Sequence, residues 1–582
     1  MRKVRISFFG LGYVGLTTAA CFAHKGFKVT CFDIDESKIE TLNSGKTPFF
    51  EPRLEELVKT SVETNFLKAV KDPVKAVLDS EMTFITVGTP NKEDGSIDLT
   101  SIKEASKTIG EALRLKDSWH LIVVKSTVIP TTTENVVGNN IKKYSGKHLG
   151  SDFGLCVNPE FLREGNAVED TFKPDRIVIG ESDKKSGDLL EAFYREFYNN
   201  NFPPIIRTSL VNAELIKYVN NAFLAMKVSF INMIANLCQE IPGSDIEIVA
   251  KGIGLDKRIG QLFLKAGVGW GGSCWPKDLK ALLNFSVKNN VELPLVESTL
   301  KINEAQPYKL IDLAKELIGE LNSKRIAVLG LAFKPDTDDM RYAVSIKIIE
   351  KLLEEGAKVV AYDPKAGHNA KKIFRDIIEY ADSIQECLKD SECALIVTEW
   401  DDFRKLKPED FVKLMKIPAV VDGRRIYDPG LYSPKLRFAA IGLGRRKYHN
   451  PAFAANAIIK EGERILLVKR AIEPCKGLWS LPGGFMEYNE TVETSLVREV
   501  EEETGLKVKP LKIIGVYSDP LRSPVKHVIT ISYECSIVGG ALRPSSENSE
   551  IKFFPINNLP KRLAFDHFKI IKEYTKAHSK NS

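Results

Sequence analysis

The sequence predicts an α/β protein with two doubly wound domains, a helical middle domain between them, and an α+β domain at the C-terminal end. Strand and helix patterns alternate over residues 1–208 and again over residues 319–446, which is typical of parallel sheets covered by helices. Residues 209–318 carry almost no strand pattern, whereas residues 450–582 combine several strands with one acidic helix. The chain has 582 residues, the length of about four domains of roughly 150 residues each.

The composition is that of an ordinary globular protein. Hydrophobic residues make up 43% and charged residues 27%, which argues against a disordered, collagen-like or membrane-spanning chain. The 83 basic side chains exceed the 77 acidic ones by only six, so we expect neither a nucleic-acid nor a membrane partner. The nine cysteines form no C-x-x-C pair, which favours a reducing, cytoplasmic location.

A glycine turn follows the first predicted strand, Val4–Phe9. Gly10 permits a tight turn, Gly12 lets the backbone approach a pyrophosphate, and Gly15 lets the following helix pack closely on the strand. Asp33 ends the second predicted strand, where its carboxylate would accept a hydrogen bond from a ribose 2′-hydroxyl and repel a 2′-phosphate. This pattern predicts an NAD site and disfavours NADP.

The remaining elements follow in chain order. The first domain continues with strands over Met82–Val87, Leu121–Lys125 and Ile177–Gly180, and the middle domain has helices over Val211–Glu240, Asp245–Gly252 and Pro276–Lys288. The third domain has strands over Lys324–Leu331, Lys358–Tyr362, Ala394–Thr398 and Ala419–Asp422 and a helix over Val344–Glu355. After a boundary at residues 448–451, strands follow over Ala454–Ile459 and Ile465–Arg470, and later ones run to Phe554. The long, mostly apolar middle helix predicts a dimer interface.

A cysteine lies in a glycine-rich loop, Gly267–Asp278, at a predicted helix start. There the helix dipole and a neighbouring lysine could lower the pKa of the Cys274 thiol. The competing interpretation is that Cys274 is a small buried apolar residue. Two further pairs are spaced four residues apart: Glu160 with Glu164, and Lys217 with Asn221 on one helix face, which by itself would also fit a solvated surface.

Residues 1 to about 446 resemble the UDP-glucose/GDP-mannose dehydrogenase family, which has two Rossmann-like domains. The motifs that carry the resemblance occur in the family's order, and they are Gly10–Gly15, Val87–Pro90, Lys125–Thr127, Asn158–Gly165, Lys217 with Asn221, Gly271–Cys274, Gly330–Pro335, Asp338–Arg341 and Asp422–Arg424. The resemblance implies a four-electron oxidation in which a sugar CH₂OH becomes a carboxylate at the expense of two NAD. UDP-glucose is favoured, and GDP-mannose or a UDP-N-acetylhexosamine remains the alternative.

The same resemblance implies the roles of individual residues. Cys274 would trap the intermediate aldehyde as a thiohemiacetal and then a thioester. Lys217 and Asn221 would stabilise the alkoxide and the oxyanion, and Glu160, Thr127 and Asp278 would hold and activate water. NAD would contact Asp33, Lys38, Thr89, Thr127, Glu164, Lys277 and Arg341. The nucleotide sugar would contact Phe161, Leu162, Lys217, Phe263, Leu264, Lys265, Ala266, Gly267, Gly271 and Lys334. Three residues depart from the family pattern: Trp270, Trp275 and Tyr342.

The acidic helix near the C-terminus follows Leu481–Gly484 with the spacing of the Nudix box. Residues 450–582 thus resemble the Nudix hydrolases, on the side that cleaves ADP-ribose and NADH. Glu499, Glu502 and Glu503 fall on one helix face, where three carboxylates repel one another unless a cation such as Mg²⁺ or Mn²⁺ joins them. Arg498 would orient the cluster, and Glu550 is a possible further ligand. A solvated acidic helix is the alternative, and either half of the chain could also be only a binding or regulatory module.

Overall fold

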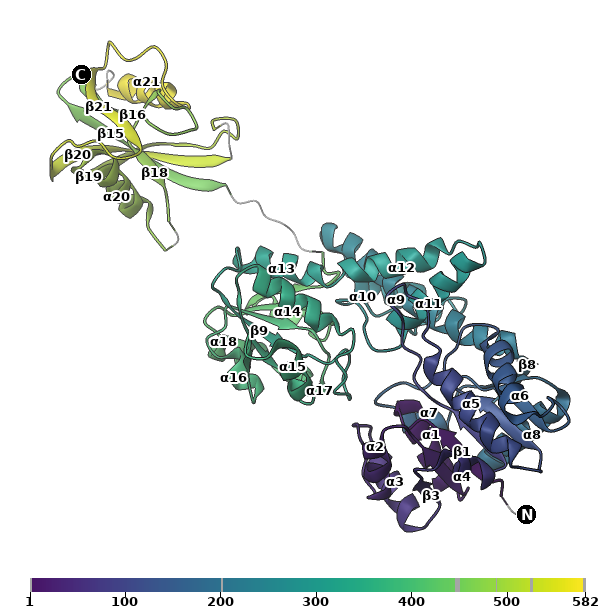
Figure 1. Ribbon diagram of the computed structural model, residues 1–582. Coiled ribbons are helices and arrows are strands. Elements are labelled where there is room, and N and C mark those ends of the chain that lie inside the picture. Colours follow the sequence, from purple (N-terminus) through teal and green to yellow (C-terminus); the bar gives the residue numbers. More distant parts are fainter. Residues whose placement is uncertain (1–2, 200–201, 445–450, 488, 524–526, 579–582) are drawn as a thin grey trace. The chain divides into compact units, whose positions relative to one another are not determined.

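The computed structural model describes residues 3–199, 202–444, 451–487, 489–523 and 527–578. The chain forms two compact units, Met1–Arg446 and Lys447–Ser582, and each is described by itself (Figure 1). Of the predicted boundary at residues 448–451, only Pro451 lies within the described residues. The finer division of the first unit at residues 208/209 and 318/319 stays a prediction.

The first unit opens with an eight-stranded sheet in the order β3-β2-β1-β4-β5-β6-β7-β8. All neighbours are parallel except β6 and β7, which are antiparallel. Two separate apolar clusters cover the two faces of this sheet, as a doubly wound fold requires. The strands are β1 (Ile6–Phe9), β2 (Val29–Phe32), β3 (Leu67–Ala69), β4 (Met82–Ile85), β5 (His120–Val124), β6 (Phe153–Val157), β7 (Ile177–Glu181) and β8 (Ile205–Ser209).

A second, six-stranded sheet is wholly parallel, in the order β11-β10-β9-β12-β13-β14. Its strands are β9 (Arg325–Leu329), β10 (Lys358–Tyr362), β11 (Glu379–Tyr380), β12 (Cys393–Ile396), β13 (Ala419–Asp422) and β14 (Arg437–Ala440). The prediction of two α/β domains is confirmed. Several short strands had not been predicted, among them β6, a fully buried strand without polar alternation that periodicity alone does not distinguish from a helix.

Both parallel sheets anchor a glycine turn with a carboxylate from the next strand. Leu11 N donates to Asp33 Oδ2 at 2.7 Å, and in the second sheet Leu331 N donates to Asp363 Oδ2, also at 2.7 Å. Gly10 has a φ of 107°, and a side chain there would come within 2.8 Å of the Thr86 backbone. Glycine at this turn is therefore required both by conformation and by space.

The segment between the two sheets is helical in its described residues. It contains α9 (Leu210–Glu240), α10 (Ile246–Gly254), α11 (Trp275–Lys288), α12 (Pro294–Ala305) and α13 (Tyr308–Ile318). Among the described helices only α9 is long and apolar enough to cross a membrane by length and composition. One face of α9 buries Glu214, Lys217 and Asn221 and packs against α11, α12 and β7, so α9 is a core helix of this unit.

The second unit is a mixed sheet with one helix on each face, which confirms the predicted α+β domain. Strand β15 pairs parallel with β20, and the other pairs are antiparallel. The strands are β15 (Ala452–Glu461), β16 (Arg464–Arg470), β17 (Trp479–Ser480), β18 (Gly483–Phe485), β19 (Leu506–Tyr517), β20 (Val528–Gly540) and β21 (Asn548–Pro555). The helices are α20 (Val492–Thr504), which is the acidic helix, and α21 (His567–His578).

Candidate active sites

Three segments of the first unit bring five predicted residues together. Glu160 follows β6, Lys217 and Asn221 lie on α9, and Cys274 and Asp278 lie at the start of α11. Lys217 Nζ lies 2.9 Å from Glu160 Oε1, and Asn221 Nδ2 donates to Asp278 Oδ2 at 2.7 Å. All are buried except Cys274, which reaches solvent. The site thus offers a reachable thiol beside a buried ammonium and an anchored carboxylate.

The buried pair is ionised. Burial by itself would lower the pKa of Lys217, but the Glu160 carboxylate outweighs burial, so the pKa is raised. Burial would likewise raise the pKa of Glu160, and the Lys217 ammonium lowers it instead. Lys217 therefore stays protonated and able to donate to an oxygen that gains negative charge.

The predicted lowering of the Cys274 pKa is wrong. Cys274 does sit at the N-terminal cap of α11, where the helix dipole favours a thiolate. However, enclosure by protein on its other sides and the carboxylates of Glu160 and Asp278 raise the pKa of the thiol to about 11, against the opposing charge of Lys217. The resting group is a neutral thiol, so a proton must leave when its sulfur bonds to carbon.

Lys125 is a buried lysine of this site to which the sequence interpretation gave no role. Its Nζ donates to Asn158 Oδ1 at 2.9 Å, and burial lowers the pKa of Lys125 to about 8. The sequence could have indicated this role, because Lys125 is a charged residue at the end of an apolar predicted strand and directly precedes Ser126 and Thr127. Thr127 itself is held by its backbone carbonyl, which accepts from Thr89 Oγ1 at 2.8 Å.

The glycine turn has the form expected of a dinucleotide site. A Cβ added at Gly12 would meet open space, and helix α1 (Tyr13–His24) begins there without a side-chain cap, so its first N–H groups are available to a pyrophosphate. Gly15 packs tightly, because a side chain there would come within 2.6 Å of Thr86 Oγ1. Lys38 Nζ lies 3.5 Å from Asp33 Oδ2. These features fit a bound NAD.

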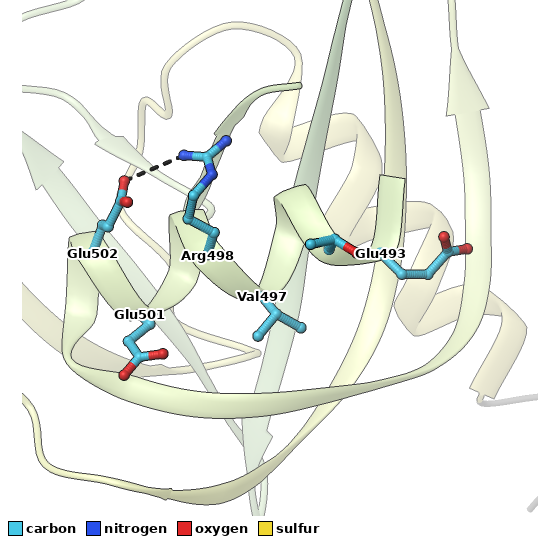
Figure 2. A pocket seen from close by; sticks show the side chains of 6 residues that line it. Glu493, Val497, Arg498, Glu501 and Glu502 are labelled. Atoms are coloured by element: carbon cyan, nitrogen blue, oxygen red, sulfur yellow. Dashed lines mark hydrogen bonds and ion pairs between the residues drawn. The ribbon is translucent and has the colours of Figure 1, made fainter. Parts of the chain in front are cut away.

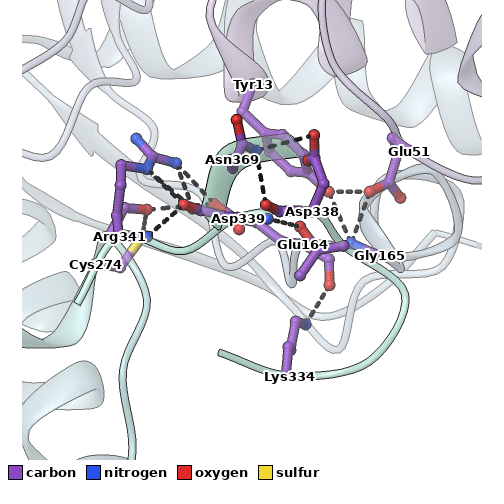
Figure 3. A network of polar contacts seen from close by, with 12 residues as sticks. Tyr13, Glu51, Glu164, Gly165, Cys274, Lys334, Asp338, Asp339, Arg341 and Asn369 are labelled. Carbon is purple, nitrogen blue, oxygen red and sulfur yellow. Dashed lines mark hydrogen bonds and ion pairs between the residues drawn. The ribbon is translucent and has the colours of Figure 1, made fainter. Parts of the chain in front are cut away.

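Glu164 joins the two sheets of the first unit through a polar network (Figure 3). Its carboxylate lies 3.4 Å from Arg341 and accepts from Ser273 Oγ at 3.2 Å, directly beside Cys274. Its backbone carbonyl accepts from Lys334 Nζ. Burial and the neighbouring Asp339 raise the pKa of Glu164 despite the opposing charge of Arg341. Two predicted NAD contacts, Glu164 and Arg341, therefore lie next to the predicted sugar contact Lys334.

Lys277 ion-pairs with the site carboxylate Asp278, with Nζ 2.6 Å from Oδ1. Among the predicted sugar contacts, Phe161 lies under Arg176 at 3.8 Å and faces Lys217 Nζ at 5.4 Å. Leu162 N donates to Glu160 Oε2 at 2.7 Å. Both residues thus line the ion pair.

The loop from Phe263 to Gly271 bridges α9 and the second sheet. Gly267 N donates to Asn232 Oδ1 at 2.8 Å, and Lys265 Nζ lies 3.7 Å from Glu399. Leu264 and Ala266 are buried, Phe263 has a φ of 63°, and a side chain at Gly271 would collide with the Tyr342 carbonyl. The loop is thus held at several points between α9 and the second sheet.

The three departures from the family pattern lie around the same loop. Trp270 and Trp275 meet edge to face at 5.6 Å, and Trp270 Nε1 donates to Ser229 Oγ at 3.0 Å. Tyr342 adopts a φ of 54° and has Lys280 Nζ 5.9 Å from its ring centre. The two tryptophans therefore pack against each other from the two ends of the segment Gly271–Cys274.

The acidic helix α20 of the second unit presents a cluster of charged side chains (Figure 2). Arg498 pairs with Glu490 at 2.9 Å, Glu499 at 2.7 Å and Glu502 at 3.3 Å. Glu503 is buried and accepts from Gly483 N at 2.8 Å. Arg498 therefore contacts two of the three predicted metal ligands, as expected.

Among the described residues no three His, Cys, Asp or Glu side chains converge closely enough to hold a metal ion as they stand. The charges nevertheless fit a cation, because burial, Glu499 and Glu547 together raise the pKa of Glu503 to about 7. Glu550 ion-pairs with Lys469 at 3.1 Å, and Glu547 adds its charge to the environment of Glu503, so both remain candidates for a further carboxylate ligand. The three carboxylates would have to come closer together to share a divalent cation.

Comparison with known proteins decides the family of the first unit. Three models of the UDP-glucose/GDP-mannose dehydrogenase family match: its NAD binding domain (residues 4–198), central domain (211–305) and UDP binding domain (327–429). UDP-glucose 6-dehydrogenase AglM of Haloferax volcanii is 45% identical over 73% of this chain and 97% of its own length. The chain belongs to the UDP-glucose/GDP-mannose dehydrogenase family.

Other relatives agree with this assignment. UDP-glucose 6-dehydrogenase TuaD of Bacillus subtilis is 42% identical over 73% of this chain and 90% of its own length. The solved UDP-glucose dehydrogenase of Pyrobaculum islandicum is 37% identical, with a TM-score of 0.70 over 76% of this chain and 98% of that one. The solved UDP-D-ManNAc dehydrogenase of Pyrococcus horikoshii is 28% identical, with a TM-score of 0.67 over 76% and 99%.

The second unit is matched by the NUDIX domain model over residues 449–574. The chain is therefore a nucleotide sugar dehydrogenase of the UDP-glucose 6-dehydrogenase type joined to a Nudix hydrolase domain. We refer below to the dehydrogenase unit (residues 1–446) and the Nudix unit (residues 447–582).

The raised thiol pKa makes a direct prediction for alkylation. In a Cys475→Ser background, iodoacetamide should modify Cys274 slowly at pH 7, with a rate that rises steadily toward pH 10, because only the thiolate reacts. Asp278→Asn removes a negative charge that raises the thiol pKa and leaves the Lys217–Glu160 pair in place, so the rate at pH 8 should rise several-fold. Mass spectrometry of the labelled peptide gives both rates. A rate that levels off below pH 8 in the parent would contradict the raised pKa.

Proposed function

We propose that the dehydrogenase unit oxidises UDP-glucose to UDP-glucuronate with two NAD. The observation that carries the proposal is the accessible Cys274 beside the Lys217–Glu160 pair and the anchored Asp278. Relatives named UDP-glucose 6-dehydrogenases, 42–45% identical over nearly their whole length, support UDP-glucose over other nucleotide sugars. The predicted NAD and sugar contacts keep their assignments in this proposal.

In the first oxidation the sugar C6 hydroxyl becomes an aldehyde. The C6 hydroxyl proton passes to water held by Glu160, Thr127 and Asp278, and a hydride leaves C6. NAD supplies the hydride acceptor when bound. The buried Lys217 ammonium and the Asn221 amide donate hydrogen bonds to the C6 oxygen while it carries negative charge. Because Lys217 is held in place by Glu160, it need not reorganise during this step.

The second oxidation needs the thiol. Cys274 sulfur bonds to the aldehyde carbon, the aldehyde oxygen gains a proton, and the thiol proton is lost, which yields a thiohemiacetal. Loss of the hydroxyl proton and of a second hydride then leaves a thioester. Asp278, oriented by Asn221 and Lys277, accepts a proton from the water that attacks this thioester, with Glu160 and Thr127 holding that water. The products are the carboxylate and the free thiol.

The dehydrogenase unit should form two NADH per UDP-glucose and be far slower with NADP. Cys274→Ser should abolish steady-state turnover yet keep NAD and UDP-glucose binding, and Lys217→Ala should lower kcat by about 10²–10³-fold because it removes an oxyanion donor. Absorbance at 340 nm counts the NADH, and calorimetry measures the binding. One NADH per sugar with free aldehyde as product would refute the mechanism. If GDP-mannose or a UDP-N-acetylhexosamine were turned over faster than UDP-glucose, that compound would be the substrate instead.

We further propose that the predicted middle domain, residues 209–318, forms a homodimer. Opposite its buried face, α9 exposes a stripe of apolar side chains spaced three, four or seven residues apart: Val219, Phe223, Phe230, Met233 and Leu237. Such a continuous apolar stripe on one long helix is costly in water and is typical of a helix that pairs with a second copy.

Light scattering at micromolar concentration should give about twice the chain mass of 65.0 kDa. The double variant Phe223→Glu/Phe230→Glu places charges in the stripe and should shift the mass to that of one chain. Leu521→Glu is the control, since Leu521 is also exposed but lies in the Nudix unit. A parent protein with the mass of one chain would refute the dimer.

Because turnover by Cys274 needs a free thiol, we also infer that the enzyme works in a reducing cytoplasm. All nine cysteines are free, and seven of them are buried.

For the Nudix unit we propose metal-assisted attack of water on a phosphoanhydride in a nucleoside diphosphate linked to a second group. ADP-ribose, NADH and UDP-sugars are of this class. Glu499, Glu502 and Glu503 would hold Mg²⁺ or Mn²⁺, which supplies Lewis-acid polarisation when bound. The supporting observation is the concentration of carboxylates around Glu503, with Glu547 adding to it and Arg498 as the adjoining cation.

Glu502→Gln keeps the size of the side chain and removes one charge, so Mg²⁺ affinity and hydrolysis should both fall. Glu463→Gln is the matched control in the Nudix unit, because Glu463 is exposed in the turn between β15 and β16 and lies 3.6 Å from Lys460. Release of monophosphates from ADP-ribose, NADH and UDP-glucose measures hydrolysis, and the NADH-forming rate should not change in either variant. If the parent cleaves none of these compounds, the unit is a binding module.

A further inference from the structure

Glu214 is a buried carboxylate on α9 to which the mechanism above gives no role. Only 2% of its surface is exposed. Its Oε2 accepts from Thr131 N at 2.6 Å, and its Oε1 accepts from Thr133 N at 2.8 Å. Both oxygens therefore hold backbone N–H groups of a turn that lies about 80 residues away in sequence.

The turn that Glu214 holds is strained. Thr131 has a φ of 77°, and a β-branched residue rarely adopts this left-handed conformation. The turn leads into η1 (Thr133–Gly138), a π-helical segment whose N-terminal cap, Thr132, makes no side-chain capping bond. Glu214 caps this segment from another element and so supplies acceptors that the local sequence lacks.

The strained turn ends the segment that carries Thr127. On its N-terminal side this segment is tied to the first sheet, because Ser126 Oγ donates to the Val87 carbonyl at 2.7 Å and Thr89 donates to the Thr127 carbonyl. On its C-terminal side Glu214 ties it to α9. Lys217 follows Glu214 by one helical turn on the same buried face.

We propose that Glu214 is a positioning residue that clamps the Thr131 turn to α9 and thereby sets the distance between Thr127 and the Lys217–Asn221 pair. The proposal rests on the function proposed for the dehydrogenase unit. Glu214 does not touch the reacting atoms; it acts through the turn and the helix that carry them.

The clamp weakens on protonation, because a carboxylic acid has lost one of its acceptor oxygens to an O–H donor. Burial raises the pKa of Glu214 to about 7; Glu134 of η1 adds to the shift, and the two N–H donors oppose it. The pKa of the neighbouring Tyr218 hydroxyl is raised well above its usual value, so Tyr218 stays neutral. A raised pKa means that the clamping charge is lost as pH falls through about 7.

The test compares Glu214→Gln, Thr131→Gly and the double variant in the full-length protein. Glu214→Gln should lower kcat by about 10–100-fold, as expected for a misplaced catalytic group, and leave both KM values within about two-fold. It should also remove the decline of kcat below pH 7 that the clamp predicts for the parent. Thr131→Gly alone should keep the parent's kcat, because glycine adopts a φ of 77° without strain. The double variant should recover at least part of the lost kcat, which a purely structural role of Glu214 would not predict.

Two controls keep the proposal falsifiable. Glu196→Gln makes the same change at an exposed site of α8 (Lys184–Tyr198) and should behave as the parent. Amide hydrogen exchange over residues 126–135 needs no substrate, and it should be faster in Glu214→Gln than in the parent. Unchanged exchange, an unchanged kcat and pH profile, or a double variant no better than Glu214→Gln would each overturn the clamp. If the parent oxidises no nucleotide sugar, the proposed function fails, and exchange alone decides the clamp.

Discussion

The chemistry proposed for the dehydrogenase unit depends on one buried ion pair, Lys217 with Glu160. Removing one partner of such a pair leaves an uncompensated charge and typically costs about 3–5 kcal/mol. The pair keeps an ammonium beside a neutral thiol, in a site where Asp278 adds further negative charge. Burial by protein, to which the carboxylates of Glu160 and Asp278 add, raises the pKa of the Cys274 thiol and keeps it protonated at neutral pH. In the proposed mechanism, the thiol reacts when a substrate brings an electrophilic carbon to Cys274 and a hydrogen-bond acceptor to Lys217.

Buried carboxylates that accept backbone N–H groups recur throughout the dehydrogenase unit. Asp33 and Asp363 hold the glycine turns of the two parallel sheets, and Asp422 holds the turn after β13. Glu51 holds another turn in the same way, because its carboxylate accepts a hydrogen bond from Gly165 N at 2.7 Å. A carboxylate offers several lone pairs on a short stem, so one side chain can satisfy two or more N–H groups that a tight turn leaves without partners. The turns that shape both nucleotide sites are fixed in this way.

The Nudix unit concentrates charge differently. Its two apolar clusters, one on each face of the mixed sheet, give it a core of its own. On α20 the carboxylates are compensated in this structure by Arg498 and by Gly483 N, which keeps them apart. A divalent cation would replace these partners and draw the carboxylates together. Metal binding would therefore break the contacts with Arg498 and Gly483 N and form contacts with the cation.

The sequence by itself determined the two parallel sheets, the helical middle and the family of each unit, because strand–turn–helix alternation and motif spacing are local properties. It also grouped Glu160, Lys217 and Cys274, although they lie far apart in the chain. Only the tertiary structure decided the charge state of Cys274, because burial and the carboxylates of Glu160, Glu164 and Asp278, which lie on two segments far apart in the chain, set it together. The role of Glu214 also depends on the tertiary structure. In the sequence, a single Glu on a helix suggests a surface residue, but in the fold Glu214 is buried under a turn some 80 residues away. Burial and long-range charge are sums over contacts that only the folded chain creates.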